Sequence, residues 1–234
     1  MSKMQIKITE DGPYIVEGGV PLDEQIMVNG EQERIYEQRR TFEPGETYAL
    51  CRCGHSKNPP FCDGAHVSTG FDGTETASRE PFDERADVFE GPTLDLFDDG
   101  RCAYARFCHR GERDAWTLTE EADNPHLRYE AIKASWDCPT GRLVHHDKDA
   151  GYAPLEQEFE PSISILQDRE YRTSGPLYVK GNIPLIGADG VQYELQNRYA
   201  LCRCGFSSEK PFCDARHIRV RFRDGLDEKD PGEK

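Results

Sequence analysis

The feature that most constrains this chain is a metal-ligand spacing that occurs twice. Residues 51–66 read CRCGHSKNPPFCDGAH and residues 202–217 read CRCGFSSEKPFCDARH, so both copies follow the pattern C-x-C-x8-C-x3-H. Cysteine and histidine are the ligand types that soft and borderline metals prefer. Four unligated residues would have no reason to keep one spacing twice, and the sequence therefore predicts two metal sites.

In the first copy the four ligand-type residues form two pairs. Cys51 and Cys53 are two apart, so in an extended segment their thiolates lie on one side and can bind one ion. Cys62 and His66 are four apart, which places them on one face of a helical turn between Pro60 and His66 and lets them bind a second ion. Two such pairs suit a two-metal cluster. A single zinc ion remains the alternative, although zinc knuckles typically use C-x2-C.

The composition favours small units held together by metal. Apolar residues make up 36% of the 234 residues, which is little for one large core. The nine cysteines are odd in number and no apolar leader opens the sequence, so reduced cysteines of a cytoplasmic protein fit better than a secreted disulfide framework. No apolar run approaches the roughly 20 residues of a membrane-spanning helix, so we expect no membrane association.

The net charge of −15 argues against nucleic acid as a partner, because neutralising phosphates takes an excess of Lys and Arg. It suits steering towards a partner with a basic docking surface, or simply a well-solvated acidic surface.

The repetition extends beyond the two motifs. GPYIVEGGVPL at 12–22 recurs as GPLYVKGNIPL at 175–185, and YALCRCG at 48–54 recurs at 199–205. The first copy carries extra residues between these blocks, within VNGEQERIYEQRRTFEPG. The alternation in MQIKI, YIV and IRVRF predicts short strands in both units.

The pattern of the motif resembles that of the CDGSH iron–sulfur domains, the mitoNEET-like proteins, which is C-x-C-x2-S-x3-P-x-C-D-G-small-H. The first copy fills this pattern completely, with Cys51, Cys53, Ser56, Pro60, Cys62, Asp63, Gly64, Ala65 and His66. The second copy supplies Cys202, Cys204, Ser207, Pro211, Cys213, Asp214 and His217. It departs from the pattern at Ala215 and Arg216, which we expect to alter the backbone geometry and potential of its site rather than remove it.

The resemblance implies one [2Fe-2S] cluster in each copy, held by three cysteines and one histidine. A neutral imidazole in place of a thiolate raises the potential of such a cluster, as in Rieske centres. It also competes with a proton for the iron, so that cluster retention depends on pH. Family members usually pair two chains, and two units in one chain therefore imply a monomer that contains an internal pseudo-dimer.

The other pattern residues are predicted to lie around the clusters, namely Ser56, Pro60, Asp63, Ser207, Pro211 and Asp214. We expect the serine hydroxyls to donate hydrogen bonds to the cluster or to its loop. The aspartates either accept hydrogen bonds from backbone amides beside the cluster or cap the short helix. His55 is expected at the surface, because Phe206 takes its place in the second copy.

Three further cysteines lie between the copies. Cys102 and Cys108 are spaced C-x5-C, and Cys138 precedes a proline. Bacterial ferredoxins use C-x2-C-x2-C with a distant C-P, and Ala105 stands where the middle cysteine would be. The segment thus resembles the divergent single-cluster ferredoxin domains found beside CDGSH motifs in some bacterial proteins. Three cysteines suit a [3Fe-4S] cluster.

Two alternatives to that cluster stay open. One is a [4Fe-4S] cluster with a non-cysteine fourth ligand, although the adjacent His109 would point away from Cys108. The other is three free, partly buried thiols and no cluster. We expect the remaining histidines of the segment, His126, His145 and His146, to lie in loops, and Trp116 and Trp136 to lie in the core.

Together these features predict an α+β fold with two small β-rich CDGSH-type units in a pseudo-twofold arrangement and a central ferredoxin-like α+β segment. The predicted parts are a first [2Fe-2S] unit at 1–80, the central segment at 85–160, a second [2Fe-2S] unit at 170–224 and a disordered tail at 225–234. A helix near 125–136 with Asn124 as its N-cap should end at Cys138-Pro139.

The function predicted from these sites is electron transfer or redox sensing with a redox partner. The alternative is storage of iron–sulfur clusters and their transfer to an apo-protein acceptor, and structural zinc is the weaker third hypothesis. Enzyme activity is not expected, since the sequence lacks a nucleophile elbow, a phosphate loop, a paired-histidine hydrolase motif and a flavin or nicotinamide fingerprint.

Overall fold

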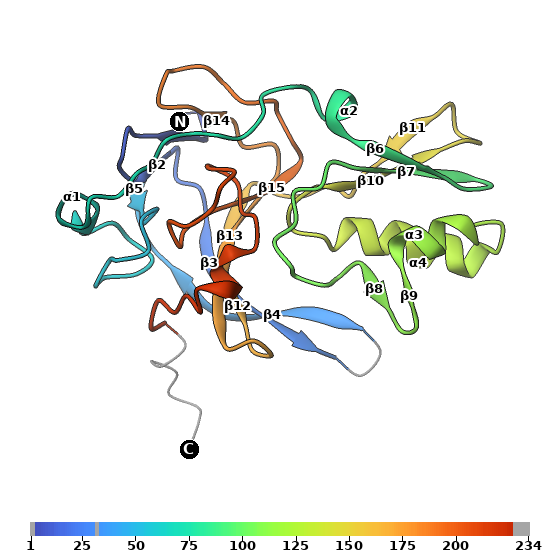
Figure 1. Cartoon of the computed structure of the whole chain (residues 1–234), viewed down its shortest axis with the longest axis horizontal. Helices are drawn as coiled ribbons and strands as arrows, with labels where there is room; N and C mark the ends of the chain where they lie inside the picture. The colour runs from blue at the N-terminus through green and yellow to red at the C-terminus, as the bar shows by residue number, and fades with distance from the viewer. Residues whose placement is uncertain (1–2, 31–32, 227–234) are drawn as a thin grey trace.

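The computed structural model describes residues 3–30 and 33–226 as a mixed α+β, strand-rich structure with several sheets (Figure 1). Most of the tail predicted to be disordered, residues 227–234, lies outside the described part. Leu226, the last described residue, is buried in the main core. None of the helices in the described ranges has the length and apolarity that a membrane crossing requires.

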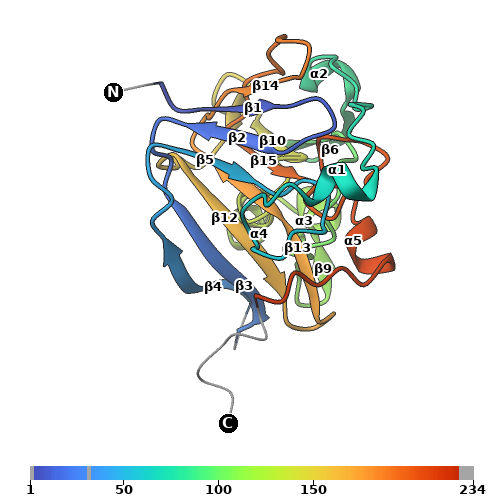
Figure 2. The same ribbon diagram turned by 90° about the vertical axis from the view of Figure 1, so that its left-hand side faces the viewer.

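The two repeats build two sheets together (Figure 2). The first sheet has the order β14-β1-β2-β5, with β14 (Leu185–Ile186), β1 (Gln5–Ile8), β2 (Tyr14–Glu17) and β5 (Thr47–Leu50). The second has the order β15-β13-β12-β3-β4, with β15 (Arg198–Leu201), β13 (Thr173–Lys180), β12 (Ser162–Asp168), β3 (Leu22–Asn29) and β4 (Arg34–Phe42). Each sheet therefore contains strands from both repeats.

The repeats exchange one strand in each direction, and the registers match. Strand β14 pairs in parallel with β1, so that Leu185 faces Ile6. Strand β3 pairs in parallel with β12, so that Leu22 faces Ile163. Leu22 and Leu185 hold the same position in the repeated block GPxxVxGxxPL. Neither sheet can be completed by one repeat alone, so the two repeats fold as one structure.

The extra residues of the first repeat form β4, an edge strand antiparallel to β3. Its exposed positions carry Ile35, Glu37, Gln38 and Thr41, and its three arginines are half-buried. The inward residues of both sheets share one core. This core includes Ile6, Tyr14, Val16, Leu50, Ile163, Ile165, Leu177, Val179 and Leu201.

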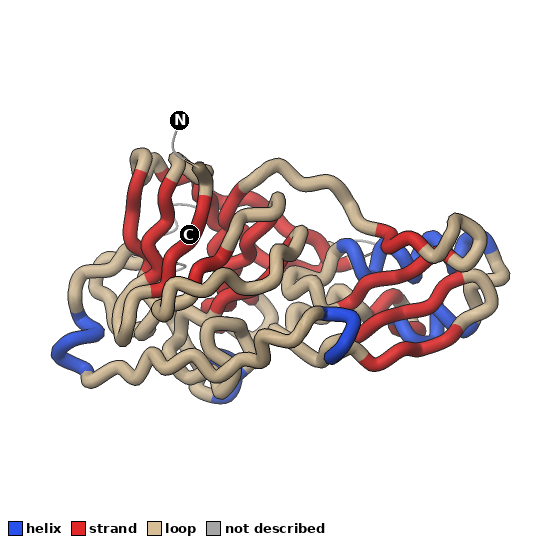
Figure 3. The backbone as a smooth tube through the Cα atoms, turned by 90° about the horizontal axis from the view of Figure 1, so that it is seen from above, coloured by secondary structure: helices blue, strands red, loops and turns tan. Residues whose placement is uncertain are grey.

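The central segment forms a second layered part beside the repeats (Figures 1 and 3). Its antiparallel sheet has the order β11-β10-β7-β6, with β11 (Ala153–Leu155), β10 (Leu143–Asp147), β7 (Leu94–Asp98) and β6 (Asp87–Glu90). Two helices cover one face, α3 (Ala115–Glu120) and α4 (Pro125–Trp136). The smaller elements are α2 (Phe82–Arg85), β8 (His109–Arg110) and β9 (Arg113–Asp114).

The helix predicted at 125–136 is confirmed as α4. The side chain of Asn124 accepts hydrogen bonds from the backbone N–H of His126 at 2.9 Å and of Leu127 at 3.4 Å, which satisfies two donors of the first turn. Trp116 and Trp136 pack, partly buried, against the cores between these helices and the sheet.

Two local predictions are wrong. The residues IRVRF at 218–222 do not form a strand, because α5 (Arg216–Arg219) takes the first of them and Arg221 turns the backbone with a φ of 52°. The helical turn expected between Pro60 and His66 is instead α1 (Ala65–Thr69). It therefore includes His66 but not Cys62.

Candidate metal centres

Each motif is a loop that leaves a sheet strand and folds back on it. In the first copy Cys51 N–H donates to the carbonyl of Pro60 at 2.8 Å, and Cys62 N–H donates to the carbonyl of Ala49 at 2.9 Å. In the second copy the equivalent bonds run from Cys202 to Pro211 at 2.8 Å and from Cys213 to Ala200 at 2.9 Å. The peptide bonds before Pro60 and Pro211 are both cis. The two loops therefore share one backbone path.

The ligand-type side chains of the first copy meet in pairs. The Sγ atoms of Cys51 and Cys53 lie 3.7 Å apart, and Cys62 Sγ lies 3.4 Å from His66 Nδ1. Two thiolates on one tetrahedral ion, each with a bond of about 2.3 Å, would be separated by about 3.75 Å. The first pair fits that geometry, and in the second pair His66 turns Nδ1 towards the thiol of Cys62.

The second copy repeats this arrangement. The Sγ atoms of Cys202 and Cys204 lie 3.6 Å apart, and Cys213 Sγ lies 3.4 Å from His217 Nδ1. Within residues 3–30 and 33–226, no three histidine, cysteine or acidic side chains converge as they would on one ion. The ligands instead stand as two pairs in each loop, which is the arrangement that a cluster of two irons requires.

The serines and aspartates of the motif hold the loops. Ser56 Oγ donates to the carbonyl of Phe61 at 2.6 Å, and Ser207 Oγ donates to that of Phe212 at 2.7 Å. The carboxylate of Asp63 accepts hydrogen bonds from Lys57 N–H at 2.8 Å and Ala65 N–H at 3.0 Å.

Asp214 does the same in the second copy with the backbone N–H of Ser208 at 2.8 Å and of Arg216 at 3.2 Å. The residue at the N-cap of each short helix is the one after the aspartate, Gly64 or Ala215. Each aspartate therefore joins the two arms of its loop.

Replacement of the motif glycine by alanine leaves the backbone conformation intact. Gly64 has a φ of 87° and a ψ of 0°, and Ala215 has a φ of 65° and a ψ of 4°. A left-handed conformation strains any residue with a Cβ atom, so the second loop holds this geometry at a cost that the first does not carry.

The two loops touch each other through a pair of glycines. Gly54 and Gly205 follow the second cysteine of each motif, with φ values of 79° and 85°. A Cβ atom on Gly54 would lie 2.6 Å from the carbonyl oxygen of Cys204, and one on Gly205 would lie 2.6 Å from that of Cys53. Each glycine thus allows the backbone of one ligand loop to rest on the other.

Several residues that contact the loops were not predicted from the sequence. The phenol of Tyr14 donates to the carbonyl of Cys202 at 2.7 Å, so the first repeat supports the second site. Burial raises the pKa of this phenol well above its ordinary value. Arg52 and Arg203 lie within the two motifs and are buried, and Arg203 donates to the carbonyls of Gly175 at 2.7 Å and Leu166 at 3.1 Å.

The repeated CRC is the sequence feature that could have identified these two arginines. The x of C-x-C is arginine in both copies, in a position whose side chain points away from the two thiolates. These buried guanidinium groups hydrogen-bond to carbonyls of their own repeat, as Arg52 does with Thr9 and Gly73. They fix each loop to the sheet behind it.

The thiols differ in acidity because they differ in burial and hydrogen bonding. Burial raises the pKa of Cys53 to about 11 and raises that of Cys62. In the second pair, a hydrogen bond from Cys204 lowers the pKa of Cys202 to about 6 and in turn raises that of Cys204. Burial also lowers the pKa of His217 to about 4, so its imidazole is neutral at physiological pH, as a metal ligand must be.

Two of the three central cysteines lie together in the core of the central segment. Cys108 and Cys138 pack in one cluster with Leu96, Ala115, Ala134 and Leu143. Burial, together with the charges of Cys138 and Cys102, raises the pKa of Cys108 to about 12. The three thiols are therefore close enough for their charges to interact, but among the described residues they do not form a three-ligand group that would hold a metal ion.

Polar groups surround these thiols. Tyr104 N–H donates to Cys102 Sγ at 3.3 Å, and the hydroxyl of Thr140 lies 3.2 Å from Cys138 Sγ. Burial alone would lower the pKa of Arg142, but its ion pair with Asp98 and the adjacent cysteines raise it. A permanent cation beside the cysteines favours their thiolate form, which metal binding needs. His109 is exposed on β8.

The prediction that His145 and His146 lie in a loop is wrong, since both are in β10. His145 is fully buried, with Nε2 2.8 Å from the hydroxyl of Thr119 and Nδ1 2.8 Å from that of Ser135. Burial lowers its pKa to about 3. His126 is likewise in a helix, α4, rather than in a loop.

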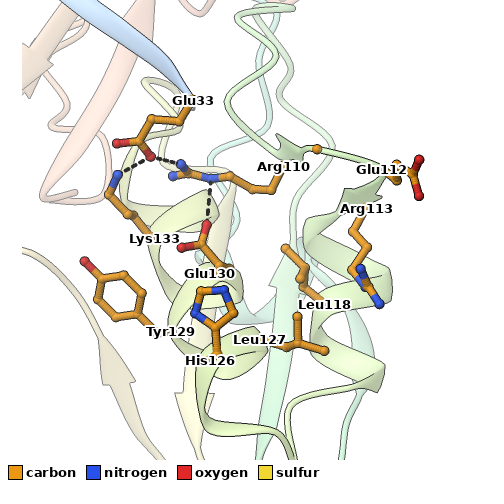
Figure 4. Close-up of a pocket in the computed structure, with 11 residues that line it drawn as sticks. Glu33, Arg110, Glu112, Arg113, Leu118, His126, Leu127, Tyr129, Glu130 and Lys133 are labelled. Carbon is orange, nitrogen blue, oxygen red and sulfur yellow. Dashed lines mark hydrogen bonds and ion pairs between the residues drawn. The ribbon is translucent and has the colours of Figure 1, made fainter. Parts of the chain in front are cut away.

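A surface pocket of about 540 Å³ lies apart from the cysteine sites, between the start of β4, the β8–β9 turn and α4 (Figure 4). Its charged groups pair with one another. Arg110 and Lys133 both contact Glu33, and Arg110 Nε is 3.9 Å from Glu130. The described residues that line it include no cysteine. The pocket therefore offers an ionic ligand little uncompensated charge.

A comparison with protein families agrees with this geometry. A family model described as iron-binding zinc finger CDGSH type matches residues 11–67 and 174–218. The chain therefore contains two CDGSH-type iron-binding regions, and such regions imply binding of [2Fe-2S] clusters. The match leaves the central segment uncovered. No curated protein and no solved structure matches the chain.

Proposed function

We propose that this chain is an electron-transfer or redox-sensing protein with two [2Fe-2S] clusters and a [3Fe-4S] cluster in the central segment. The ligands of the first [2Fe-2S] cluster are Cys51, Cys53, Cys62 and His66, and those of the second are Cys202, Cys204, Cys213 and His217. Cys102, Cys108 and Cys138 hold the third cluster in this proposal.

The observation that carries the proposal is the contact between the sites. The loops of the two motifs rest on each other at Gly54 and Gly205. The central segment adjoins the second motif, because Ala103 packs in one buried cluster with Cys213, and Cys102 is close enough to raise the pKa of Cys213. Three redox centres placed next to one another can pass electrons along the chain.

The strand exchange supports an internal pseudo-twofold arrangement in a monomer. Matching registers at β1–β14 and β12–β3 give one chain the pairing that two separate chains would otherwise supply. The nine free thiols suit a reducing compartment such as the cytoplasm. The net charge of −15 favours a redox partner with a basic docking surface.

The test is EPR spectroscopy on anaerobically purified protein, together with counts of iron and acid-labile sulfide. An oxidised [3Fe-4S] cluster is paramagnetic and an oxidised [2Fe-2S] cluster is silent. We expect a signal in the oxidised sample that Cys102→Ser removes, and further signals on reduction that it leaves. A silent oxidised sample would eliminate the third cluster, and zinc without labile sulfide would eliminate all three.

Cluster transfer to an apo-protein is the second candidate function. The observation that favours it is the partial exposure of Cys62 and His66 in the first motif. Reversible reduction with all clusters retained supports electron transfer at both sites, whereas loss of a cluster to an apo-ferredoxin supports transfer.

A further inference from the structure

The two motifs have the same ligand types but different surroundings. In the first, Cys62 and His66 are half-buried, and the next residue, Val67, is 79% exposed. In the second, Cys213 is 3% exposed and His217 is 2% exposed. Because the backbone paths of the two loops are equivalent, the difference comes from what lies over each loop.

The segment at 101–107 covers the second motif. Ala103 forms a buried cluster with Cys213 and Ala200. Further along, Ala105 and Phe107 are buried against the second sheet, in a cluster with Met27, Leu166 and Tyr178. Alternate residues of this segment therefore pack against the second sheet, and Ala103 covers Cys213.

Arg106 fixes the segment in this position. Its guanidinium lies 2.7 Å from Asp168 at the end of β12 and 4.3 Å from the centre of the Tyr171 ring. The charges of Asp168 and Arg106 both act on His217, which places this ion pair close to the histidine ligand. Arg106 itself is held in a left-handed conformation, with a φ of 66°.

The first motif has its helix at the outer edge of the molecule. Figure 1 shows α1 projecting at the end far from the central segment, while the red C-terminal part of the chain that contains α5 lies nearer to that segment. The motif phenylalanines differ accordingly. Phe61 and Phe212 both pack edge-on against aromatic rings of their own repeat, and the ring of Phe212 also lies 4.0 Å from the guanidinium of Arg101 in the central segment.

We propose that the two [2Fe-2S] sites have different tasks: the first site gives its cluster to an acceptor protein, and the second keeps its cluster, sealed beneath the central segment, for electron transfer. This inference rests on the proposed function, since it requires a [2Fe-2S] cluster at both sites. The chemical class of acceptor is an apo-protein with four free thiols.

The transfer is a ligand exchange without oxidation or reduction. Each bond that forms from iron to an acceptor thiolate replaces a bond to Cys51, Cys53, Cys62 or His66, and both irons and both sulfides leave together. The acceptor thiols release four protons, of which three pass to the vacated cysteines and the fourth to His66 or to water. The bonds of the half-buried pair Cys62 and His66 to iron are exchanged first, because an acceptor can reach this pair from solvent.

The experiment measures cluster loss from the full chain at constant pH, by visible absorption, after addition of an excess of an iron chelator. In the Cys102→Ser variant, which removes the absorption of the third cluster, we expect two phases of equal amplitude. Their rates should differ roughly tenfold or more, because an exposed loop opens more readily than a covered one. Cys62→Ser should remove the fast phase and Cys213→Ser the slow one. An apo-ferredoxin should take up only the fast-phase cluster.

Arg106→Ala provides a test that keeps all ligands in place. Loss of the Asp168 pair should loosen the cover and accelerate the slow phase alone, while the fast phase is unchanged. The control is Arg113→Ala, which removes an exposed ion pair with Glu121 at 2.8 Å. A single rate for both clusters, or a slow phase that belongs to the first motif, would overturn the inference. Protein without [2Fe-2S] clusters would instead overturn the proposed function.

Discussion

The contact between the two ligand loops can be tested by adding one methyl group to it. Gly54→Ala and Gly205→Ala each place a Cβ atom 2.6 Å from a backbone oxygen of the opposite loop, at φ values of 79° and 85°. Real Cβ atoms do not approach oxygen so closely, so the loops must separate. Gly45→Ala is the matched control, because Gly45 has a φ of 84° and no atom within 4 Å of an added Cβ.

The magnitude follows from three contributions. The left-handed conformation costs alanine about 1–2 kcal/mol at all three positions. The smaller entropy of the unfolded alanine chain offsets this by about 0.4–1 kcal/mol. The clash adds about 1–3 kcal/mol at Gly54 and Gly205 alone. The free energy of unfolding should therefore fall by about 2–4 kcal/mol in the two loop variants and by about 1 kcal/mol in the control.

The assay is urea denaturation followed by far-UV circular dichroism. With a denaturant slope of about 2 kcal/mol/M, the loop variants should unfold about 1 M urea earlier than Gly45→Ala. The double variant should lose less than the sum of the single losses, since one separation of the loops relieves both clashes. Equal midpoints for Gly54→Ala and Gly45→Ala would show that the loops do not press on each other.

Three further predictions concern single side chains. Ala215→Gly should raise the free energy of unfolding by about 0.5–1 kcal/mol, because it removes left-handed strain, and Gly64→Ala should lower it by a similar amount. The urea midpoints of both variants test this, and a lower midpoint for Ala215→Gly would contradict it. Tyr14→Phe should cost about 1–2 kcal/mol by leaving the carbonyl of Cys202 without its buried donor, whereas Tyr129→Phe, at a position 54% exposed, should cost almost nothing. His145 has a folded-state pKa of about 3. Below its ordinary pKa of about 6.5, its imidazole therefore binds a proton in the unfolded chain but not in the folded chain. The free energy of unfolding of the wild type should therefore fall relative to that of His145→Gln as the pH drops from about 6.5 towards 3, by up to about 1.4 kcal/mol per pH unit. Urea denaturation at a series of pH values tests this, and a stability difference that does not vary with pH would refute it.

The sequence was sufficient for the ligand geometry because that geometry is local. Cys51 and Cys53 meet as expected, since two residues of extended chain bring their side chains to one side. The pair Cys62 and His66 also meets, although α1 begins only at Ala65. The loop turns without a helix there, and a hydrogen-bonded aspartate replaces the expected helical turn.

The exchange of strands could not be predicted, because no local pattern records which strand lies next to which. Strand β14 has only two residues, and its partner β1 lies at the other end of the chain.

The wrong prediction that His145 lies in a loop has a different cause. Alternate residues of LVHHD point inward, but histidine and aspartate at inward positions hide the strand from a hydropathy pattern. The hydroxyls that make this burial possible come from α3 and α4.

The unequal burial of the two motifs has a general physical reason. In a symmetric dimer of identical chains, both sites must have the same surroundings. Joining two copies into one chain removes that requirement, because the connecting segment is a single object and can lie over only one of two equivalent loops. Here the connection contains a folded segment with its own cysteines, and its loop at 101–107 packs on Cys213. The two sites can then differ in cluster retention without any change in the ligands that they hold.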